Sequence, residues 1–113
     1  MKSVAIEVQI EGSTGTRYVA SFIRVGDSLK TSCTCQAGER QMHCKHRLSL
    51  IDGDITKVRG NVPPDLAQQI AAMVNGTEVD AALLALASAE VEAKTASEKL
   101  RRAKKTLDRV MHQ

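Results

Sequence analysis

The stretch that decides the fold is Cys33-Thr34-Cys35, then eight residues, then Cys44-Lys45-His46. It contains all three cysteines of the 113-residue chain and two of its three histidines. Tetrahedral zinc takes four thiolate or imidazole ligands in structural sites, and Cys3His is one of the usual sets. The pairing and the loop between the pairs therefore predict one structural Zn2+ ion, held by Cys33, Cys35, Cys44 and His46.

The spacing within each pair restricts the backbone around such an ion. Residues i and i+2 of a strand face the same way, but their Cα atoms lie about 6.5 Å apart. Cys33 and Cys35 can therefore share an ion only if the backbone bends between them. On a helix, residues i and i+2 lie about 200° apart. We therefore expect Cys44 at or before the first turn of a helix, with His46 at the start of it.

Other interpretations of this stretch stay open at this point. The cysteines could be unrelated buried residues that fall together by chance, or two of them could form a redox pair. A disulfide framework is a poor explanation, because the cysteine count is odd and no secretory signal is visible. His43 is a rival fourth ligand, because it directly precedes Cys44. Asp52 and Asp54 are more typical of turns than of metal ligands.

The residues before Cys33 predict an antiparallel β-meander. Val4, Ile6, Val8 and Ile10 alternate with small or polar residues, which indicates a half-buried strand. The stretch 18–25 is rich in β-branched and aromatic residues and predicts a second strand, and 28–31 begins a third. After Cys44, Leu48 and Ile51 are spaced for a short helix that ends at Gly53. Residues 54–58 fit neither state clearly.

The second half of the chain is expected to be helical. Pro63 and Pro64 precede apolar residues at helical spacing, which predicts a helix over 64–75. Residues 81–113 contain neither glycine nor proline and are dominated by strong helix formers, so a long helix is expected over 78–111. The fold class is therefore α+β. The expected division is a zinc-binding meander with its short helix over 1–60 and a helical region with a basic tail over 61–113.

The metal stretch resembles the SWIM zinc finger, whose pattern is Cys-x-Cys, a variable gap, then Cys-x-His. The resemblance runs from Tyr18 through the four ligands to Ile51, roughly a third of the chain. It implies a short β-meander leading into the first ligand pair and a helix starting at the second. It also favours His46 over His43 as the fourth ligand. Because SWIM modules occur in transposases, chromatin-remodelling ATPases, recombination mediators and ubiquitin ligases, the resemblance implies binding to DNA or protein rather than catalysis.

Composition gives the metal a physical purpose. Tyr18 and Phe22 are the only aromatic residues, and there is no tryptophan, so a small core lacks its largest packing groups. Structural zinc supplies folding free energy directly. The net charge of +3 is unevenly placed, because residues 94–113 carry +5 and residues 1–93 carry −2. A basic tail of this kind can meet nucleic acid or an acidic protein surface, and it can equally be a solvated helix face.

The long helix carries apolar residues whose partner the sequence leaves open. A heptad frame with Val79, Leu86, Ala93, Leu100 and Leu107 at position a, and d four residues later, predicts a poor coiled coil, because three of its d residues (Glu90, Ser97 and Lys104) are polar. The last part is better. An apolar stripe there invites packing against the body of the chain or a second copy, as a homodimer: Ala96, Leu100, Ala103, Leu107 and Val110.

Two functions compete at this stage. The first is an accessory protein that binds zinc and contacts DNA phosphates through its basic residues, namely Arg40, Lys45, Arg47, Arg101, Arg102, Lys104 and Lys105. The second is a protein-interaction adaptor or inhibitor, in which zinc is purely structural and the long helix docks on a partner or dimerises. A thiol-based redox switch is a third, weaker alternative.

No enzyme signature appears in the sequence, and a closed Cys3His site would not activate water, so we expect no catalysis. No apolar stretch is long enough to span a membrane, and no signal peptide is visible, so a cytoplasmic protein is expected. The small size suits an accessory protein of a phage or mobile element.

Overall fold

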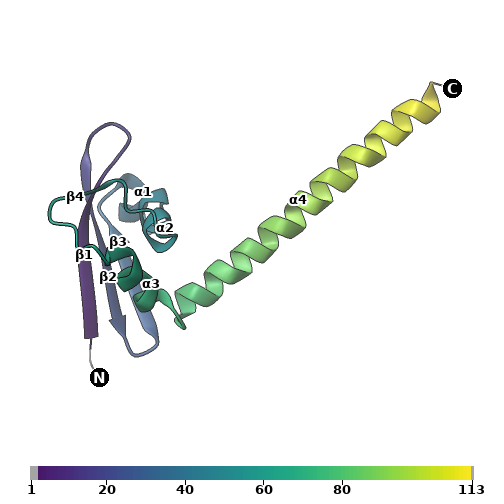
Figure 1. The fold of residues 1–113 in the computed structure, drawn as a ribbon. Helices are drawn as coiled ribbons and strands as arrows, with labels where there is room; N and C mark the ends of the chain where they lie inside the picture. Colours follow the sequence, from purple (N-terminus) through teal and green to yellow (C-terminus); the bar gives the residue numbers. More distant parts are fainter. Residues whose placement is uncertain (1–2, 113) are drawn as a thin grey trace. The chain divides into compact units, whose positions relative to one another are not determined.

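The computed structural model describes residues 3–112, and they fall into two compact units that divide between Asp80 and Ala81. The first unit holds a four-stranded antiparallel sheet and three short helices, and the second consists of most of one long helix. The expected α+β class is therefore confirmed (Figure 1).

The sheet is built on the expected meander. Its strands are β1 (Ser3–Glu11), β2 (Arg17–Val25), β3 (Ser28–Cys33) and β4 (Val58–Arg59), in the order β3-β2-β1-β4. The sequence pattern did not indicate β4, because only two of its residues pair with β1. This short strand pairs with the edge of β1 opposite β2. The chain segment that joins β3 to β4 contains Cys35, Cys44 and His46.

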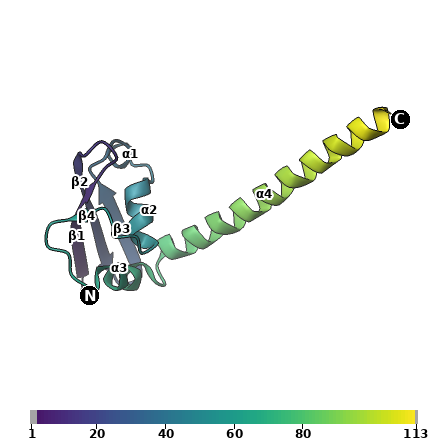
Figure 2. The same cartoon turned by 45° about the horizontal axis from the view of Figure 1, so that its top comes forward.

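One face of the sheet is buried, as the alternation in β1 predicts. Ile6 of β1 pairs with Phe22 of β2, and Phe22 pairs with Thr31 of β3, so these side chains share that face. The helices α2 (Lys45–Ile51) and α3 (Leu66–Val74) lie on it (Figures 1 and 2). Apart from the three cysteines, Phe22 and Met73, the buried hydrophobic residues are aliphatic, and the largest fully buried side chains are Phe22, Leu50, Leu66 and Ile70.

Arg24 is a charged residue on this inner face, and its side chain caps the C-terminal end of α3. Its guanidinium donates hydrogen bonds to the backbone carbonyl oxygens of Ala72, Met73 and Asn75, at 3.0, 3.2 and 2.7 Å. These carbonyls belong to the last turn of α3, where no later amide can reach them. Arg24 thus fastens the end of α3 to a central strand of the sheet.

The helix α3, which follows the division expected at residue 60, lies within the first unit. Four apolar residues of α3, Leu66, Ile70, Met73 and Val74, are buried, so the helix belongs to the first unit rather than to a separate helical region. The short helix expected after Cys44 is present as α2. A further helix, α1 (Gln36–Glu39), lies in the loop between the ligand pairs.

The long helix is α4 (Glu78–Met111), with the bounds that the sequence indicates. Its start is marked by Thr77, whose hydroxyl accepts a hydrogen bond from the Asp80 amide, while the Asp80 carboxylate accepts one from the Gly76 amide. Within Glu78–Met111 no residue is buried. Across residues 3–112, no single helix is both long and apolar enough to cross a bilayer.

Candidate metal centre

The four residues of the predicted site come together at one end of the buried face. The three cysteines are buried and His46 is half-buried, and one donor atom from each lies within 4.8 Å of all the others. Donor atoms around a tetrahedral zinc ion lie roughly 3.5–4 Å apart, so the cluster needs little adjustment to surround one. The structure therefore contains a Cys3His group that can hold one metal ion, and zinc is the plausible one.

The bend expected between Cys33 and Cys35 occurs at Thr34. β3 ends at Cys33, and Thr34 then uses both its backbone and its side chain against one residue of β2. Its amide donates to the Val19 carbonyl oxygen at 3.1 Å, and its hydroxyl accepts from the Val19 amide at 2.9 Å. The hydroxyl replaces a carbonyl in the ladder, so the backbone can turn while the sheet hydrogen bonds stay satisfied. This turn brings both sulfur atoms to the same side.

Two of the ligands cap helices. Cys35 precedes α1 and its Sγ accepts a hydrogen bond from the Gly38 amide at 3.4 Å, while Cys44 precedes α2 and its Sγ accepts from the Arg47 amide at 3.5 Å. Both cysteines have extended backbone angles, as helix-capping residues do. Each of these two sulfur atoms is therefore held in place by a backbone amide of the helix that follows it. The expectation that Cys44 lies before the first turn is confirmed.

His46 completes the group. Its Nδ1 lies 4.0 Å from the Sγ of Cys33, and its ring stacks at a tilt on Tyr18, with 5.1 Å between ring centres. Its Nε2 is buried, and among the described residues it is a side-chain atom with no hydrogen-bond partner. Because Nδ1 is the ring nitrogen beside the Cys33 sulfur, His46 already turns a possible metal donor toward the cysteines. The residues present therefore fit a metal.

His43, the rival ligand, lies outside the cluster. It is exposed and lines an open surface hollow of about 530 Å3 beside the ligands, together with Tyr18 and Ala37. The resemblance-based preference for His46 thus agrees with the geometry. Asp54 behaves as a turn residue, because its carboxylate accepts hydrogen bonds from the amide and hydroxyl of Thr56.

The protein prepares the ligands unequally for metal. Burial raises the pKa of the Cys33 thiol to about 12. Burial also acts to raise the pKa of Cys44, but the hydrogen bonds that its sulfur accepts from Arg47 outweigh it, and the pKa ends below the ordinary thiol value. Burial, and then the charge of Lys45, lower the pKa of His46, which keeps its imidazole neutral and able to coordinate. A bound cation would therefore stabilise the thiolate form most at Cys33, where burial opposes it most strongly.

Arg47 is a supporting residue of this centre. Its Nε donates to the Cys44 sulfur at 3.1 Å, one terminal nitrogen donates to the Thr31 hydroxyl at 3.1 Å, and the other donates to the Met42 carbonyl oxygen. The guanidinium thus ties the second ligand pair to β3 and to the loop before α2. Sequence reasoning grouped Arg47 with the nucleic-acid contacts, because a basic residue beside a metal motif carries no sign of an internal partner.

Gly38 is a second supporting residue, which sequence reasoning did not identify. A Cβ at Gly38 would collide with the carbonyl group of Cys33 and would lie 2.9 Å from the Cys33 Cβ. The missing side chain lets α1 lie directly against the first ligand, so the Gly38 amide reaches the Cys35 sulfur. The single glycine in the loop between the ligand pairs was the available sign.

The other basic residues predicted to contact nucleic acid are exposed to solvent. Lys45 stands between Cys44 and His46 at the start of α2, Arg40 follows α1 in the loop between the ligand pairs, and both are exposed. The tail residues Arg101, Arg102, Lys104 and Lys105 are exposed along α4, in the second unit.

Comparison of the chain with protein-family models, curated proteins and solved structures finds no match.

Proposed function

We propose that the first unit is a SWIM-type zinc module and that its zinc has a structural role. The observation that carries this is the Cys3His group itself, with its donor atoms within 4.8 Å of one another and the Nδ1 atom of His46 beside the Cys33 sulfur. A bound zinc ion would supply positive charge that stabilises buried thiolates. With four protein ligands, no coordination position is left for water or substrate, so we propose no enzymatic activity.

The test of the zinc proposal is elemental analysis of the purified chain, which should return one zinc per chain. Cys33→Ser and Cys44→Ser should each release the metal. Ser32→Ala, an exposed serine beside Cys33, is the matched control and should retain it. A well-folded, metal-free wild-type protein would contradict the proposal.

We further propose that the module binds DNA with little or no sequence specificity. The support is electrostatic: Lys45 is exposed between two ligands, Arg40 is exposed in the loop between the ligand pairs, and the tail has a net charge of +5. Phosphate contacts from lysine and arginine supply most of the free energy of nonspecific DNA binding. Arg47 is left out of the proposed contacts, because its guanidinium already donates within the protein. With one tyrosine and one phenylalanine, base stacking is a poor alternative.

The experiment is DNA binding measured against salt concentration with zinc-loaded protein. The logarithm of the binding constant should fall steeply with the logarithm of salt. Neutralising Arg101, Arg102, Lys104 and Lys105 should make the slope shallower by roughly one for each phosphate that the variant no longer neutralises. Lys30→Gln is the matched control, because Lys30 is exposed on β3 away from the ligands. Absence of affinity at low salt would exclude DNA binding and favour the second candidate.

The second candidate is a protein-interaction adaptor or inhibitor. The observation that favours it is α4, where large apolar residues such as Leu84, Leu86 and Leu100 are all exposed. Exposed leucines in number mark surfaces that pack against another protein. Zinc then serves only to hold the first unit together.

A further inference from the structure

The apolar residues of α4 form one seam along the whole helix. In a heptad, d follows a by three residues, so the frame that places Glu90, Ser97 and Lys104 at d is wrong. With Val79, Leu86, Ala93, Leu100 and Leu107 at a, the true d residues are Ala82, Ala89, Ala96, Ala103 and Val110. All ten seam positions are apolar, at alternating spacings of three and four residues.

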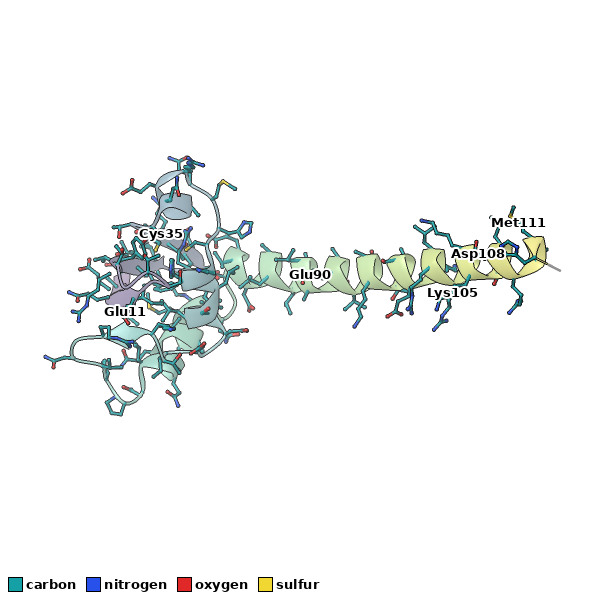
Figure 3. All side chains as sticks on the ribbon, turned by 90° about the horizontal axis from the view of Figure 1, so that it is seen from above. Glu11, Cys35, Glu90, Lys105, Asp108 and Met111 are labelled. Carbon is teal, nitrogen blue, oxygen red and sulfur yellow. The ribbon has the colours of Figure 1, made fainter. Side chains whose placement is uncertain are left out.

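This seam has no partner within α4. Leu86, Leu100 and Leu107 are each about half exposed, and Figure 3 shows the side chains of α4 projecting freely along its length. Long helices gain most of their stability from packing an apolar face rather than from propensity. A straight seam of heptad spacing fits the same seam on another helix. The charges decide which helix that is.

The two halves of α4 carry opposite charge. Residues 78–93 hold four acidic and no basic residues, whereas residues 94–112 have a net charge of +5. Figure 3 labels Glu90 in the acidic half and Lys105 in the basic half. Two α4 helices that run antiparallel place each acidic half against a basic half. Two parallel helices would place the basic halves together.

The sizes of the seam residues select the same orientation. Position a is leucine at three of its five places, and position d is alanine at four of its five. In an antiparallel pair each a residue faces a d residue, so every leucine of position a meets an alanine, and only the two central layers, where Ala93 meets Ala96, hold two alanines. A parallel pair alternates layers of two leucines with layers of two alanines, and the alanine layers would be underfilled.

We propose that two copies of this chain dimerise through α4 in an antiparallel pair centred between Lys94 and Thr95. In this register Leu86 faces Ala103 of the second copy and Leu100 faces Ala89 of the second copy. All ten seam residues find partners. Each basic tail then runs beside the acidic half of the other α4. The proposal needs neither metal nor DNA.

The flanking charges of this register are also complementary. Glu92 faces Lys99 of the second copy, and the symmetry repeats the contact, so one dimer holds two such pairs. In a parallel pair Lys99 would instead face Lys104 of the second copy, and like charges would meet twice. Charges at these flanking positions set the orientation of coiled coils.

The first test measures the mass of the full chain by sedimentation, with zinc and a reductant present so that no disulfide joins the copies. Wild type should have twice the 12.2 kDa chain mass at micromolar concentration. Leu100→Lys, in the seam, should weaken dimerisation at least roughly a hundredfold. Leu84→Lys is the matched control, because Leu84 is also exposed but lies opposite the seam. A monomeric wild type, or a dimer that survives Leu100→Lys, would overturn the proposal.

The second test fixes the orientation. Glu92→Lys and Lys99→Glu should each weaken the dimer roughly tenfold, because each replaces two attractive pairs with two repulsive ones. The double variant should recover wild-type affinity. If Lys99→Glu alone tightens the dimer and the double variant shows no recovery, the pair is parallel and the proposed register is wrong. Because neither measurement involves DNA, the dimer can be tested whether or not the protein binds DNA.

Discussion

The sheet unit and α4 contain the same kinds of apolar residue, yet one buries them and the other does not. In the first unit, Phe22, Leu50 and Ile70 have no exposed surface, whereas within α4 no residue is buried. The difference lies in where the partner of each apolar face is found. The strands and short helices of the first unit pack against one another, and the Cys3His group links them. The seam of α4 has no such partner within the helix.

This contrast explains how a chain with two aromatic residues can fold. The Cys3His group of the first unit joins β3, α1 and α2, and the zinc ion proposed there would compensate for the small core. The long helix consists of strong helix formers, and the proposed dimer would give its apolar seam a partner. Loss of the metal should therefore affect one region and leave the other almost unchanged.

Metal removal should have the largest effect. Structural zinc in small modules binds with about 10–16 kcal/mol of apparent free energy, which exceeds the stability expected of an 80-residue unit. A chelator, or Cys44→Ser, should therefore unfold the first unit while the helical circular-dichroism signal of α4 persists. NMR spectra would show it as loss of dispersed amide signals from the strands. If the strand signals remain dispersed after the metal is removed, the unit does not depend on it.

Matched leucine truncations should differ strongly between the two regions. Leu50→Ala removes a side chain with no exposed surface and should cost about 2–5 kcal/mol of unfolding free energy. Leu84→Ala removes one that is 68% exposed and should change the stability of the first unit by less than about 0.5 kcal/mol. Chemical denaturation of zinc-loaded protein, followed through the strand signals, measures both. Equal costs would contradict the contrast drawn between the regions.

Gly38→Ala should have an intermediate effect, confined to the metal centre. The new Cβ would collide with Cys33, and relieving a collision of this kind costs about 1–3 kcal/mol. Because the displaced helix carries the amide that caps Cys35, zinc affinity should fall together with stability. Competition with a chelator of known affinity measures the first quantity, and denaturation the second. Gln36→Ala, an exposed change on the same helix, is the control and should leave both near wild type.

A small pH effect is expected where α4 begins. The Glu78 carboxylate accepts hydrogen bonds from the Leu29 amide and the Ser28 hydroxyl. Its own backbone amide and then the Leu29 amide hold the pKa of Glu78 below the ordinary glutamate value. A lowered folded-state pKa contributes stability above the ordinary value, and this contribution is lost as pH falls through the folded-state pKa. Glu78→Gln should therefore be less stable than wild type at neutral pH, and the gap should close in acid. A gap that stays constant with pH would rule out the carboxylate's role.

Much of the fold can be predicted because residues close together in the sequence determine its secondary structure. The alternation in β1, the cysteine spacing and the glycine- and proline-free run over 81–113 each specify a backbone state within a few residues. The bend at Thr34 and the capping position of Cys44 follow from the spacing alone, and both are present. The sequence pattern did not indicate that α3 lies in the first unit, because its partners, α2 and β2, are found only once the chain has folded. Arg24 shows this most clearly, since it reaches the end of α3 across 51 residues of sequence.

The sequence by itself determined the cysteine pairs, the meander and the length of α4, because residue spacing acts through the fixed geometry of strands and helices, whereas the choice of His46 over His43 came from the resemblance. Tertiary structure alone decided which neighbours the supporting residues have. Gly38 lies against Cys33, Arg47 serves the Cys44 sulfur rather than solvent, and β4 adds itself to the edge of β1. The physical reason is that such contacts depend on how distant segments pack, and local periodicity carries no information about that.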